Sequence, residues 1–465
     1  MKNTNSGLLC WFVLLSLWMC SSAALAQNSI LSSTPTNNYL SQTNNNLFQP
    51  VGPSTAGSGP FGGPFMGTSG LAGVTANAAR YLPTGPPLAS WGPFGVYPHL
   101  MYTLSYGNGL EARPGENSTT LINTVAPGVF LKMGALWFID YTPSVSFYSN
   151  PLFHNVTDQK VDLAGAATNG NWMLNLSQRY LDTTQPLQET GTQLEQQAYA
   201  TAFNATGQLG DQTSLQLGVS QNFRFTPNLV NLHEWTTADW LSYQFQPQLS
   251  AALGVTAGYD ELSEGSSNPF EQALGRVIFQ PGNKLSLMVI GGVEDRQVID
   301  PSAPSIVNPI FQALATYQIR DGTLLKLIAD RMVTPSLFAN DLNVITIVSA
   351  NLHQDIIGHF SVDLSGGYTD QSFTSLVPGP LPKYYFGSAP RTDEAVIRSD
   401  TRTFARITFS TVIRTRLTAS IFAMLTDGET SQANFAYSGH QVGLTLDYRY
   451  SVTISLFCAA SHGNP

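Results

Sequence analysis

From Val96 to Tyr450 the chain alternates apolar and polar residues with a period of two. The segment FSVDLSGGY, residues 360–368, places Phe, Val, Leu and Tyr on one side and Ser and Asp on the other. Residues 137–147 (WFIDYTPSVSF), 249–259 (LSAALGVTAGY) and 441–449 (QVGLTLDYR) follow the same pattern. Because successive side chains of a strand point to opposite faces, this periodicity predicts strands with one apolar and one polar face.

The connections between these strands alternate in length. Tight turns are expected near Gly134, Asn169-Gly170, Gly210-Asp211, Pro247, 281–283, Asp321-Gly322, Gly358 and Arg414. Longer polar connections are expected near 107–118, 148–158, 182–194, 225–233, 262–268, 297–306, 335–341, 371–396 and 428–437. This alternation is typical of a meandering barrel with tight turns at one end and loops at the other. We therefore predict an all-β fold, a transmembrane antiparallel up-and-down β-barrel of about 18 strands, within a range of roughly 16–20.

The low charge content favours a membrane barrel over a soluble β protein. Charged residues make up only 11% of the chain, well below the roughly 25% of typical soluble domains. A closed barrel in lipid pairs every strand edge and turns the apolar faces towards hydrocarbon. Aromatic residues near strand ends suit interfacial girdles; they include Trp137, Trp172, Tyr180, Trp235, Trp240, Tyr259, Phe270, Tyr368 and Tyr448. A soluble protein of several sheets is the alternative.

The N-terminal residues predict a secretory signal peptide over residues 1–26. Lys2 supplies the positive region, an apolar core follows, and the small-x-small cleavage site ends at Ala26. Removal of this segment takes away Lys2 and no acid, so the mature chain is more acidic than the formal net charge of −9. This balance argues against nucleic acid as a partner. Beyond the signal no run of about 18 apolar residues occurs, which excludes a transmembrane helix.

Two regions follow the signal peptide. Residues 27–95 are rich in Pro, Gly and Asn and lack periodicity, so we predict a disordered periplasmic leader. The outer-membrane β-barrel is predicted over 96–460, with one short extra strand after Tyr450. Cys458 would be the one cysteine left after cleavage, so the fold must be stable without an internal disulfide.

One segment carries a family resemblance. Residues 124–148 read TVAPGVFLKMGALWFIDYTPSVSFY, between the exported leader and the serial hairpins. In this segment and in general layout the chain resembles the type-2 β-barrel porins, which include outer-membrane barrels associated with exopolysaccharide loci. The resemblance covers roughly Val96 to Tyr450. It implies an outer-membrane channel-like protein and assigns no functional residue.

The sequence contains none of the common catalytic motifs. There is no G-x-S-x-G elbow, H-E-x-x-H pair, phosphate-binding loop or EF-hand loop. His359, Ser361 and Asp363 share one face of a predicted strand, so a lumen-side hydrolase is a third hypothesis. A polar lumen face accounts for the same three residues without catalysis. We therefore expect no enzymatic activity, no cofactor and no metal.

An arginine-rich segment, IRSDTRTFARITFSTVIRTRLTASIFAML, spans residues 397–425. The spacing of its arginines fits one face of a helix, but it also fits a period of two, and the neighbouring Thr, Phe, Ile and Val favour strands. We predict a hairpin that turns near Arg414 and directs its arginines into the lumen, because an arginine on the lipid face costs about 2–4 kcal/mol. The candidate pore-lining residues on this parity are Arg398, Arg402, Arg406, Arg416, Asp140, Asp260, Glu294, Asp330, Asp363 and Asp447. These charges either meet a passing solute or pair with each other.

Together these features predict a protein of the bacterial outer membrane. The first hypothesis is a porin-like channel for passive diffusion of small solutes, or a component of polysaccharide export. The alternative is a plugged structural or adhesive barrel, with the loop over 371–396 plugging the lumen or contacting a partner. The expected partners are outer-membrane lipid, small solutes or polysaccharide, and further copies of the chain.

Overall fold

The computed structural model describes residues 86–111, 117–187, 189–265, 267–297, 306–338, 341–375, 396–432 and 435–450. All regular elements in these ranges are strands. Within them no helix is long and apolar enough to cross a membrane.

The strands follow one another with short intervals. They are β1 (Ala89–Trp91), β2 (Phe94–Glu111), β3 (Asn117–Met133), β4 (Trp137–Tyr148), β5 (Val156–Asn169), β6 (Trp172–Leu187), β7 (Thr192–Gln208), β8 (Thr213–Phe225), β9 (Leu232–Gln246), β10 (Leu249–Leu262), β11 (Asn268–Phe279), β12 (Leu285–Arg296), β13 (Ile306–Arg320), β14 (Thr323–Pro335), β15 (Asp341–Asp355), β16 (Phe360–Ser375), β17 (Val396–Arg414), β18 (Leu417–Thr430) and β19 (Tyr437–Arg449).

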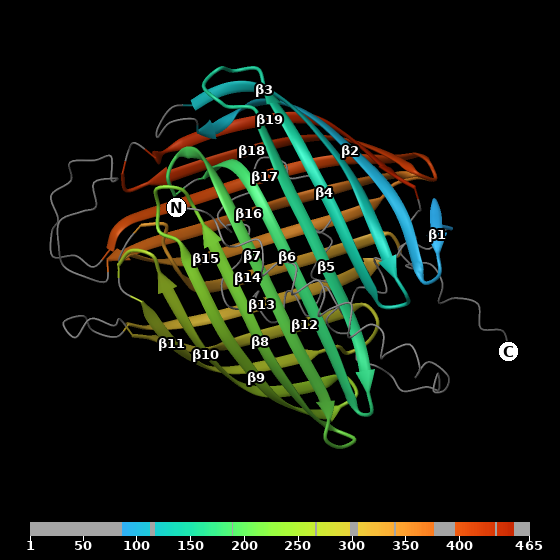
Figure 1. Cartoon of the computed structure of the whole chain (residues 1–465), viewed down its shortest axis with the longest axis vertical. Coiled ribbons are helices and arrows are strands. Elements are labelled where there is room, and N and C mark those ends of the chain that lie inside the picture. Colours follow the sequence, from blue (N-terminus) through green and yellow to red (C-terminus); the bar gives the residue numbers. More distant parts are fainter. Residues whose placement is uncertain are drawn as a thin grey trace. The chain divides into compact units, whose positions relative to one another are not determined.

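Strands β2 to β19 form a closed barrel. Each pairs antiparallel with the next along the chain, and β19 returns to pair with β2, with Leu444 opposite Leu104. Figure 1 shows the tilted strands side by side in chain order, with β19 back beside β2 and β3. Closure leaves the barrel without an open edge. The predicted fold class, an antiparallel barrel of about 18 strands, is confirmed.

The predicted alternation of connections is confirmed in part. Successive connections fall at opposite ends of the barrel, which we call the turn end and the loop end, and most of those at the turn end are the shorter ones; the two connections on either side of β7, and those on either side of β11, are equal in length. Gly170 is the first and Gly322 the second residue of a two-residue turn, and their φ angles are 57° and 74°. A positive φ of this kind is strained for a residue with a Cβ, which explains glycine at both positions.

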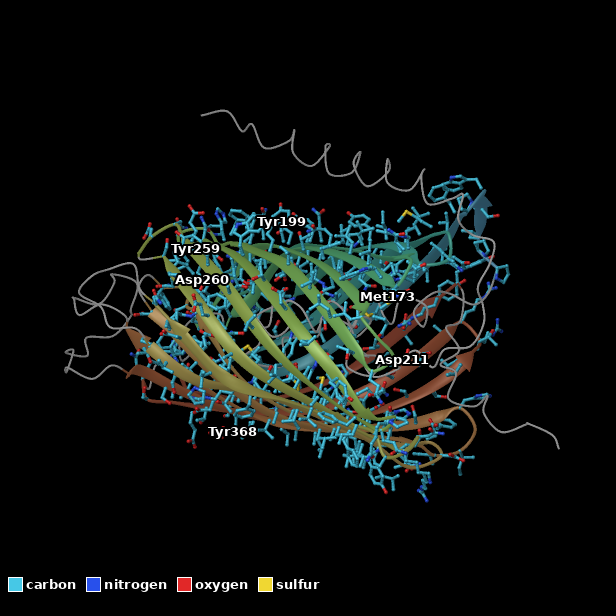
Figure 2. The ribbon with its side chains drawn as sticks, turned by 90° about the horizontal axis from the view of Figure 1, so that it is seen from below. Met173, Tyr199, Asp211, Tyr259, Asp260 and Tyr368 are labelled. Atoms are coloured by element: carbon cyan, nitrogen blue, oxygen red, sulfur yellow. The ribbon has the colours of Figure 1, made fainter. Side chains whose placement is uncertain are left out.

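The outer face of the barrel is apolar. On β10, Leu253 and Val255 are 76% and 62% exposed, whereas Ala252 before them and Thr256 after them are 7% and 5% exposed. The labelled Tyr199, Tyr259 and Tyr368 come from three different strands (Figure 2), and Tyr259 and Tyr368 are 41% and 42% exposed. An exposed apolar surface repeated around a closed barrel is suited to lipid rather than to water.

Two charged side chains interrupt this apolar face in mid-strand. Asp239 lies on β9 between the exposed Trp235 and Tyr243, on the same parity. Arg331 on β14 donates hydrogen bonds to the backbone oxygen of Pro309 (3.2 Å) and to the hydroxyl of Thr346 (2.9 Å). These bonds satisfy part of the guanidinium, which lowers the cost of holding it on the outer face.

The inner face differs between two sectors. From β2 to β8 and from β16 to β19 it carries mainly polar and charged side chains. From β9 to β15 its middle is apolar, and we call this sector the apolar wall. Its inward-facing buried members are Trp240, Leu274, Met288, Ile290, Ile310, Leu314, Met332 and Ile345. The inner faces of several of these strands mix apolar with polar side chains, so the expectation of one polar face per strand holds only in part here, whereas β10 keeps its predicted polar face.

The barrel begins before the predicted boundary at residue 96. β1 pairs with the start of β2, with Ala89 opposite Val96, so residues 89–95 belong to the sheet. Residues 1–85 and 451–465 lie outside the described ranges, as do the predicted signal peptide, most of the predicted leader and the short extra strand.

Candidate functional site

The arginine-rich segment forms the hairpin of β17 and β18, as predicted. Ser410 of β17 lies opposite Ser420 of β18, and the chain turns at Thr415 and Arg416. Arg398, Arg402 and Arg406 share the inner face of β17. The segment is therefore a pair of strands, and its three arginines line one strand of the inner wall.

Arg398 is held almost entirely within the protein. It is 2% exposed, and its guanidinium lies 3.8 Å from the ring centre of Phe435 and 5.1 Å from that of Phe373. Its Nε donates to Asp400 Oδ1 (2.8 Å) and its Nη1 to the backbone oxygen of Glu189 (2.8 Å). This candidate pore residue is thus a structural cation near the loop end.

The bonds of Glu189 define a connection across the lumen. The Glu189 carboxylate accepts hydrogen bonds from the hydroxyl of Ser336 and from the backbone N of Leu337 (2.7 Å). We call residues 189–191 and 336–338 together the inner bridge. Its members are mostly buried, with Ser336 and Leu337 at 1% and 3% exposed.

The inner bridge joins opposite sides of the barrel. Residues 189–191 connect β6 to β7 and residues 336–338 follow β14, so eight strands separate them in one direction round the wall and ten in the other. Arg224 of β8 adds bonds to the backbone oxygens of Pro335 (3.5 Å) and Ser336 (3.4 Å). Both segments are connections at the loop end, so the inner bridge spans the barrel at that end.

Arg402 and Arg406 follow Arg398 towards the turn end. Arg402 is 7% exposed and lies 5.6 Å from the ring centre of Tyr437. Arg406 is half-buried, stacks 4.3 Å from the ring centre of Phe422 and donates to the hydroxyl of Thr408 (3.3 Å). Cation–aromatic stacking fixes the guanidinium without neutralising its charge. Arg406 therefore presents a positioned positive charge further down the lumen.

Arg416 is placed differently from the other three arginines. It lies in the turn between β17 and β18, where it is exposed and stacks 4.3 Å from the ring centre of Tyr450. Its position is the turn-end rim rather than the middle of the wall.

Three carboxylates gather on the inner face near the loop end of β9 to β12. Asp260 lies directly opposite Glu234 on the neighbouring strand. Arg296 is bonded to Asp260 and donates from Nε to Glu294 Oε1 (2.8 Å), while its guanidinium covers the ring of Phe270 at 4.3 Å. Arg296, Asp260 and Glu294 are all 0% exposed. The candidates Asp260 and Glu294 are therefore partners of a buried arginine and do not face an open pore.

The remaining acidic candidates also have partners near them. Asp140 accepts a bond from His99 Nε2 (2.9 Å), and Asp447 is paired with Arg449 (2.8 Å). Asp330 is 4% exposed and lies opposite Gln312. All three lie on the inner face, and the histidine and arginine contacts favour structural pairing over solute contact.

Asp363 bears on the hydrolase hypothesis. Its Oδ1 lies 2.9 Å from Nδ1 of His353, which is directly opposite it on β15. His359 lies in the exposed turn before β16 begins at Phe360. His359 thus lies in an exposed turn, whereas Asp363 contacts His353 on the neighbouring strand, so the two proposed catalytic partners are not brought together. Within the described ranges no group of three or more His, Cys, Asp or Glu is arranged to hold a metal.

Glu189, residues 336–338 and Glu234 take part in the site although the sequence did not single them out. Glu189 and residues 336–338 belong to predicted loops, and no local pattern indicates that two loops meet across a barrel. Glu234 was detectable, because it has the inner parity of β9. Its position opposite Asp260 depends on strand register, which the sequence did not define.

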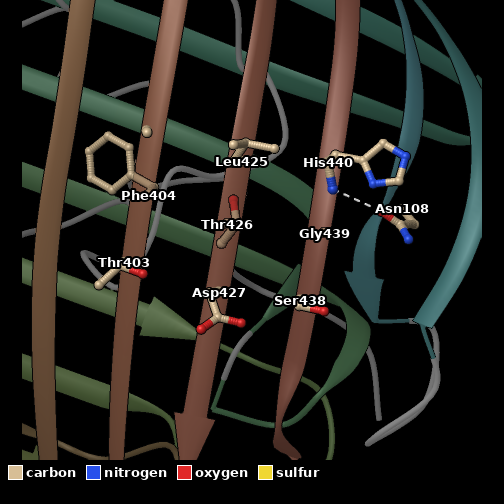
Figure 3. A pocket seen from close by; sticks show the side chains of 10 residues that line it. Asn108, Thr403, Phe404, Leu425, Thr426, Asp427, Ser438, Gly439 and His440 are labelled. Carbon is tan, nitrogen blue, oxygen red and sulfur yellow. Dashed lines mark hydrogen bonds between the residues drawn. The ribbon is translucent and has the colours of Figure 1, made fainter.

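A hollow of about 370 Å³ lies apart from the lumen, on the outer face of β17, β18, β19 and β2 (Figure 3). Its lining includes the polar side chains of Asp427 and His440, and the backbone N of His440 donates to Asn108 Oδ1 (2.8 Å). Asp427 lies three residues from the loop end of β18. This position corresponds to the rim of the apolar face, where polar groups can meet water or lipid head groups.

Comparisons with known proteins give barrel architectures only. No family model matches the chain, and no curated protein matches it. OccK2 (OpdF) of Pseudomonas aeruginosa, crystallised in complex with glucuronate, is 10% identical over 76% of this chain and 98% of its own, with a TM-score of 0.42. OpdK of Pseudomonas aeruginosa is 12% identical over 76% and 98%, at 0.40. OccAB1 of Acinetobacter baumannii is 9% identical over 80% and 98%, at 0.41. At these values the likeness carries no argument about function.

Proposed function

We propose that the protein is an outer-membrane channel through which small solutes diffuse passively. The observation that carries the proposal is the closed barrel of β2 to β19, with an apolar outer face and charged residues on its inner face. Such a barrel is stable in lipid because every strand is paired and no backbone group faces hydrocarbon unsatisfied. A charged inner face gives water and polar solutes a path that the bilayer denies them.

The channel is narrow and favours anions. The inner bridge limits passage at the loop end, where Glu189 joins residues 336–338 and Arg398. Below it, Arg406 and Arg276 present guanidinium groups stacked on Phe422 and Trp240, and neither has a carboxylate among its hydrogen-bond partners in the described ranges. The carboxylates Asp260 and Glu294, in contrast, are bonded to Arg296. The guanidinium groups of Arg406 and Arg276 are therefore the positive charges that we expect a solute to meet, with the carboxylate of Asp363 close enough to Arg406 to act on it electrostatically.

Reconstitution tests the proposal. The purified protein should migrate differently on gels before and after heating, as a folded barrel does, and should give discrete conductance steps in a planar bilayer. With a salt gradient across the bilayer, the reversal potential should indicate a preference for chloride over potassium. A barrel that folds by the gel criterion and gives no conductance would contradict the proposal.

A role in polysaccharide export is a narrower form of the same proposal. It rests on the resemblance of residues 124–148 to barrels associated with exopolysaccharide loci. A linear glycan has to pass the inner bridge, so export requires the bond between Glu189 and Leu337 to open. Block of single-channel current by an acidic oligosaccharide, absent with the neutral sugar of equal length, would support this form.

The second candidate function is a plugged barrel with a structural or adhesive role. The inner bridge and the apolar wall favour it, because neither is expected in a wide water-filled pore. Of the loop predicted over 371–396, which this reading makes the plug or the adhesive surface, residues 371–375 belong to β16, Val396 begins β17, and 376–395 lie outside the described residues. Deleting that loop separates the two functions: raised conductance indicates a plug, and lost binding to cells indicates an adhesin.

A further inference from the structure

The carboxylate of Asp239 is a feature of the outer face that a channel does not explain. Asp239 lies midway along β9, and the exposed Trp235 and Tyr243 lie four residues to either side of it. Exposed Trp and Tyr of a membrane barrel mark the two lipid–water interfaces, so Asp239 lies near the middle of the hydrocarbon layer. Leu217 and Val255 are opposite it on the neighbouring strands. Within the described ranges its carboxylate has no hydrogen-bond or ion-pair partner.

Arg331 carries the opposite charge at nearly the same depth. It lies eight residues from the turn end of β14, and Asp239 lies seven residues from the turn end of β9. Its bonds to Pro309 and Thr346 use Nε and Nη1, so Nη2 has no hydrogen-bond partner in the described part of the chain. Five strand spacings separate β9 from β14, which is about 24 Å round the wall. The two charges therefore cannot pair within one barrel.

Lipid cannot supply a partner for either charge at this depth. The charged groups of a lipid lie in its head group at the membrane surface, and the hydrocarbon layer contains none. A charged side chain within that layer is costly unless another protein group pairs with it. A second copy of this chain offers the opposite charge to both residues at matching depths. One kind of chain can thus satisfy Asp239 and Arg331 together.

The surfaces round the two charges also differ in relief. Beside Asp239, β10 presents Leu253 and Val255, which are 76% and 62% exposed. Beside Arg331, the next outer residue of β14 is Ala329, and it lies opposite an alanine of β13. Within a membrane, small side chains on one surface let the large side chains of another approach closely, and this packing contributes to association. The projecting surface at Asp239 therefore fits the shallow surface at Arg331.

We propose that copies of this chain associate side by side in the membrane, with the Asp239 face of one barrel against the Arg331 face of the next. The Asp239 carboxylate accepts a charge-assisted hydrogen bond from Nη2 of the neighbouring arginine, which removes both charges from lipid. Because the contact joins two different faces of the barrel, the assembly closes into a ring or extends as a row. The inference goes beyond the proposed channel, because the contact lies outside the lumen and holds whether or not the barrel conducts.

Cross-linking tests which faces meet. In full chains carrying Cys458→Ser, Leu241→Cys reports the Asp239 face and Ala329→Cys the Arg331 face, with both charges intact. The two chains, one of them tagged, are mixed in phospholipid liposomes and treated with a short bismaleimide. We expect a strong cross-link between the two different chains and little between identical ones. Ile421→Cys on the outer face of β18 is the matched control, because Ile421 is 56% and Leu241 52% exposed. Equal yields from Leu241→Cys with either partner would overturn the proposal.

Charge substitutions test the ion pair itself. Asp239→Asn should raise the dissociation constant of the assembly about tenfold, the size expected of one polar contact between membrane segments. Energy transfer between labelled barrels over a range of protein-to-lipid ratios measures it. Glu271→Gln removes a carboxylate from the outer face of β11 near the loop end, where water is close, and should leave the constant unchanged.

A charge exchange keeps the test independent of general damage to the fold. Asp239→Arg alone places two arginines together and should abolish association, whereas Asp239→Arg combined with Arg331→Asp should restore it. Heat-modifiable mobility shows that each variant is folded. Folded wild-type barrels that stay monomeric at every protein-to-lipid ratio would overturn the proposal, and so would association that Asp239→Asn leaves unchanged. Absence of conductance in a folded barrel contradicts the channel alone, because these measurements of association do not depend on current.

Discussion

The two sectors of the inner wall, one polar and one apolar, place opposite kinds of side chain at their inward-facing strand positions. On β17 the inner positions carry Arg398, Arg402 and Arg406, whose charges are met by aromatic rings, carboxylates and backbone oxygens. On β12 the corresponding inner positions carry Met288 and Ile290, which are 9% and 1% exposed. The outer face is apolar on both sectors because lipid requires it, whereas no such uniform requirement acts on the inner face.

Because of this difference, we expect stability and permeation to depend on different parts of the inner wall. A buried charge is stable only while its partner remains, so the paired arginines hold loops and strands in one arrangement. The apolar wall has no directional contacts and depends on whatever excludes water from it. Charges that are only partly buried, such as that of Arg406, can interact with solutes in the lumen.

The largest expected effect is on the buried charge cluster. Arg296→Met leaves Asp260 and Glu294 buried without their common partner, so we expect the free energy of unfolding in phospholipid to fall by about 3–5 kcal/mol. Arg276→Met is the matched control, because Arg276 stacks on Trp240 and donates a hydrogen bond to Ser242, and its replacement should cost about 1 kcal/mol. Urea unfolding of liposome-bound protein measures both. Equal losses would mean that pairing is not what stabilises Arg296.

A slightly smaller effect is expected on the apolar wall. Ile290→Ala removes a fully shielded side chain, and such truncations cost about 2–5 kcal/mol. Val289→Ala on the outer face of the same strand removes a side chain that is 41% exposed and should cost well under half as much. The same urea unfolding assay measures the loss in free energy of unfolding for both variants. If Val289→Ala is the more harmful, the inner sector is not a packed layer and its comparison with β17 fails.

The sequence predicted the outer features of the barrel better than the inner ones. Turns such as those at Gly170 and Gly322 have local signals, and the outer face repeats one simple requirement along β2 to β19. The segment LMVIGG, residues 287–292 of β12, is a continuous apolar run, which period-two analysis cannot divide between lipid and lumen. The apolar wall was therefore missed.

Long-range contacts in the lumen could not be predicted for a different reason. Glu189 and Leu337 are 148 residues apart, and neither lies in a strand whose register would bring them together. The arginines of β17 show the same limit at close range. Arg398 and Arg406 have the same parity, yet one is buried against Glu189 and two phenylalanines while the other is only half-buried. The parity of a residue along its strand predicts which face of the barrel it lies on. Whether its charge is buried depends on contacts with other parts of the barrel, which parity does not predict.

Breaking the inner bridge should lower the free energy of unfolding by an intermediate amount and should change the single-channel conductance. Glu189→Ala removes the acceptor of the Ser336 and Leu337 bonds, and hydrogen bonds to a charged group contribute about 1.5–3 kcal/mol each. We expect larger or more frequent open states in single-channel recordings. Glu195→Ala, an exposed outer-face residue of β7, is the control and should leave the recordings unchanged. Unaltered currents in both variants would show that the bridge does not limit passage.

The substitution of Arg406 should change the free energy of unfolding least and the ion selectivity most clearly. Arg406→Glu reverses one half-buried charge that stacks on Phe422 and donates a hydrogen bond to Thr408, so the barrel should fold with little loss of stability. Arg402, at 7% exposed, is a poorer target because its removal disturbs packing as well as charge. The lumen of the Arg406→Glu barrel is less positive, and the reversal potential in a salt gradient should shift towards cations. Glu429→Lys changes the charge by the same magnitude but with the opposite sign, on the exposed outer face near the loop end, and should not shift the potential. If the two variants shift the potential by equal amounts in opposite directions, selectivity reflects the charge of the whole protein, and β17 has no special role in permeation.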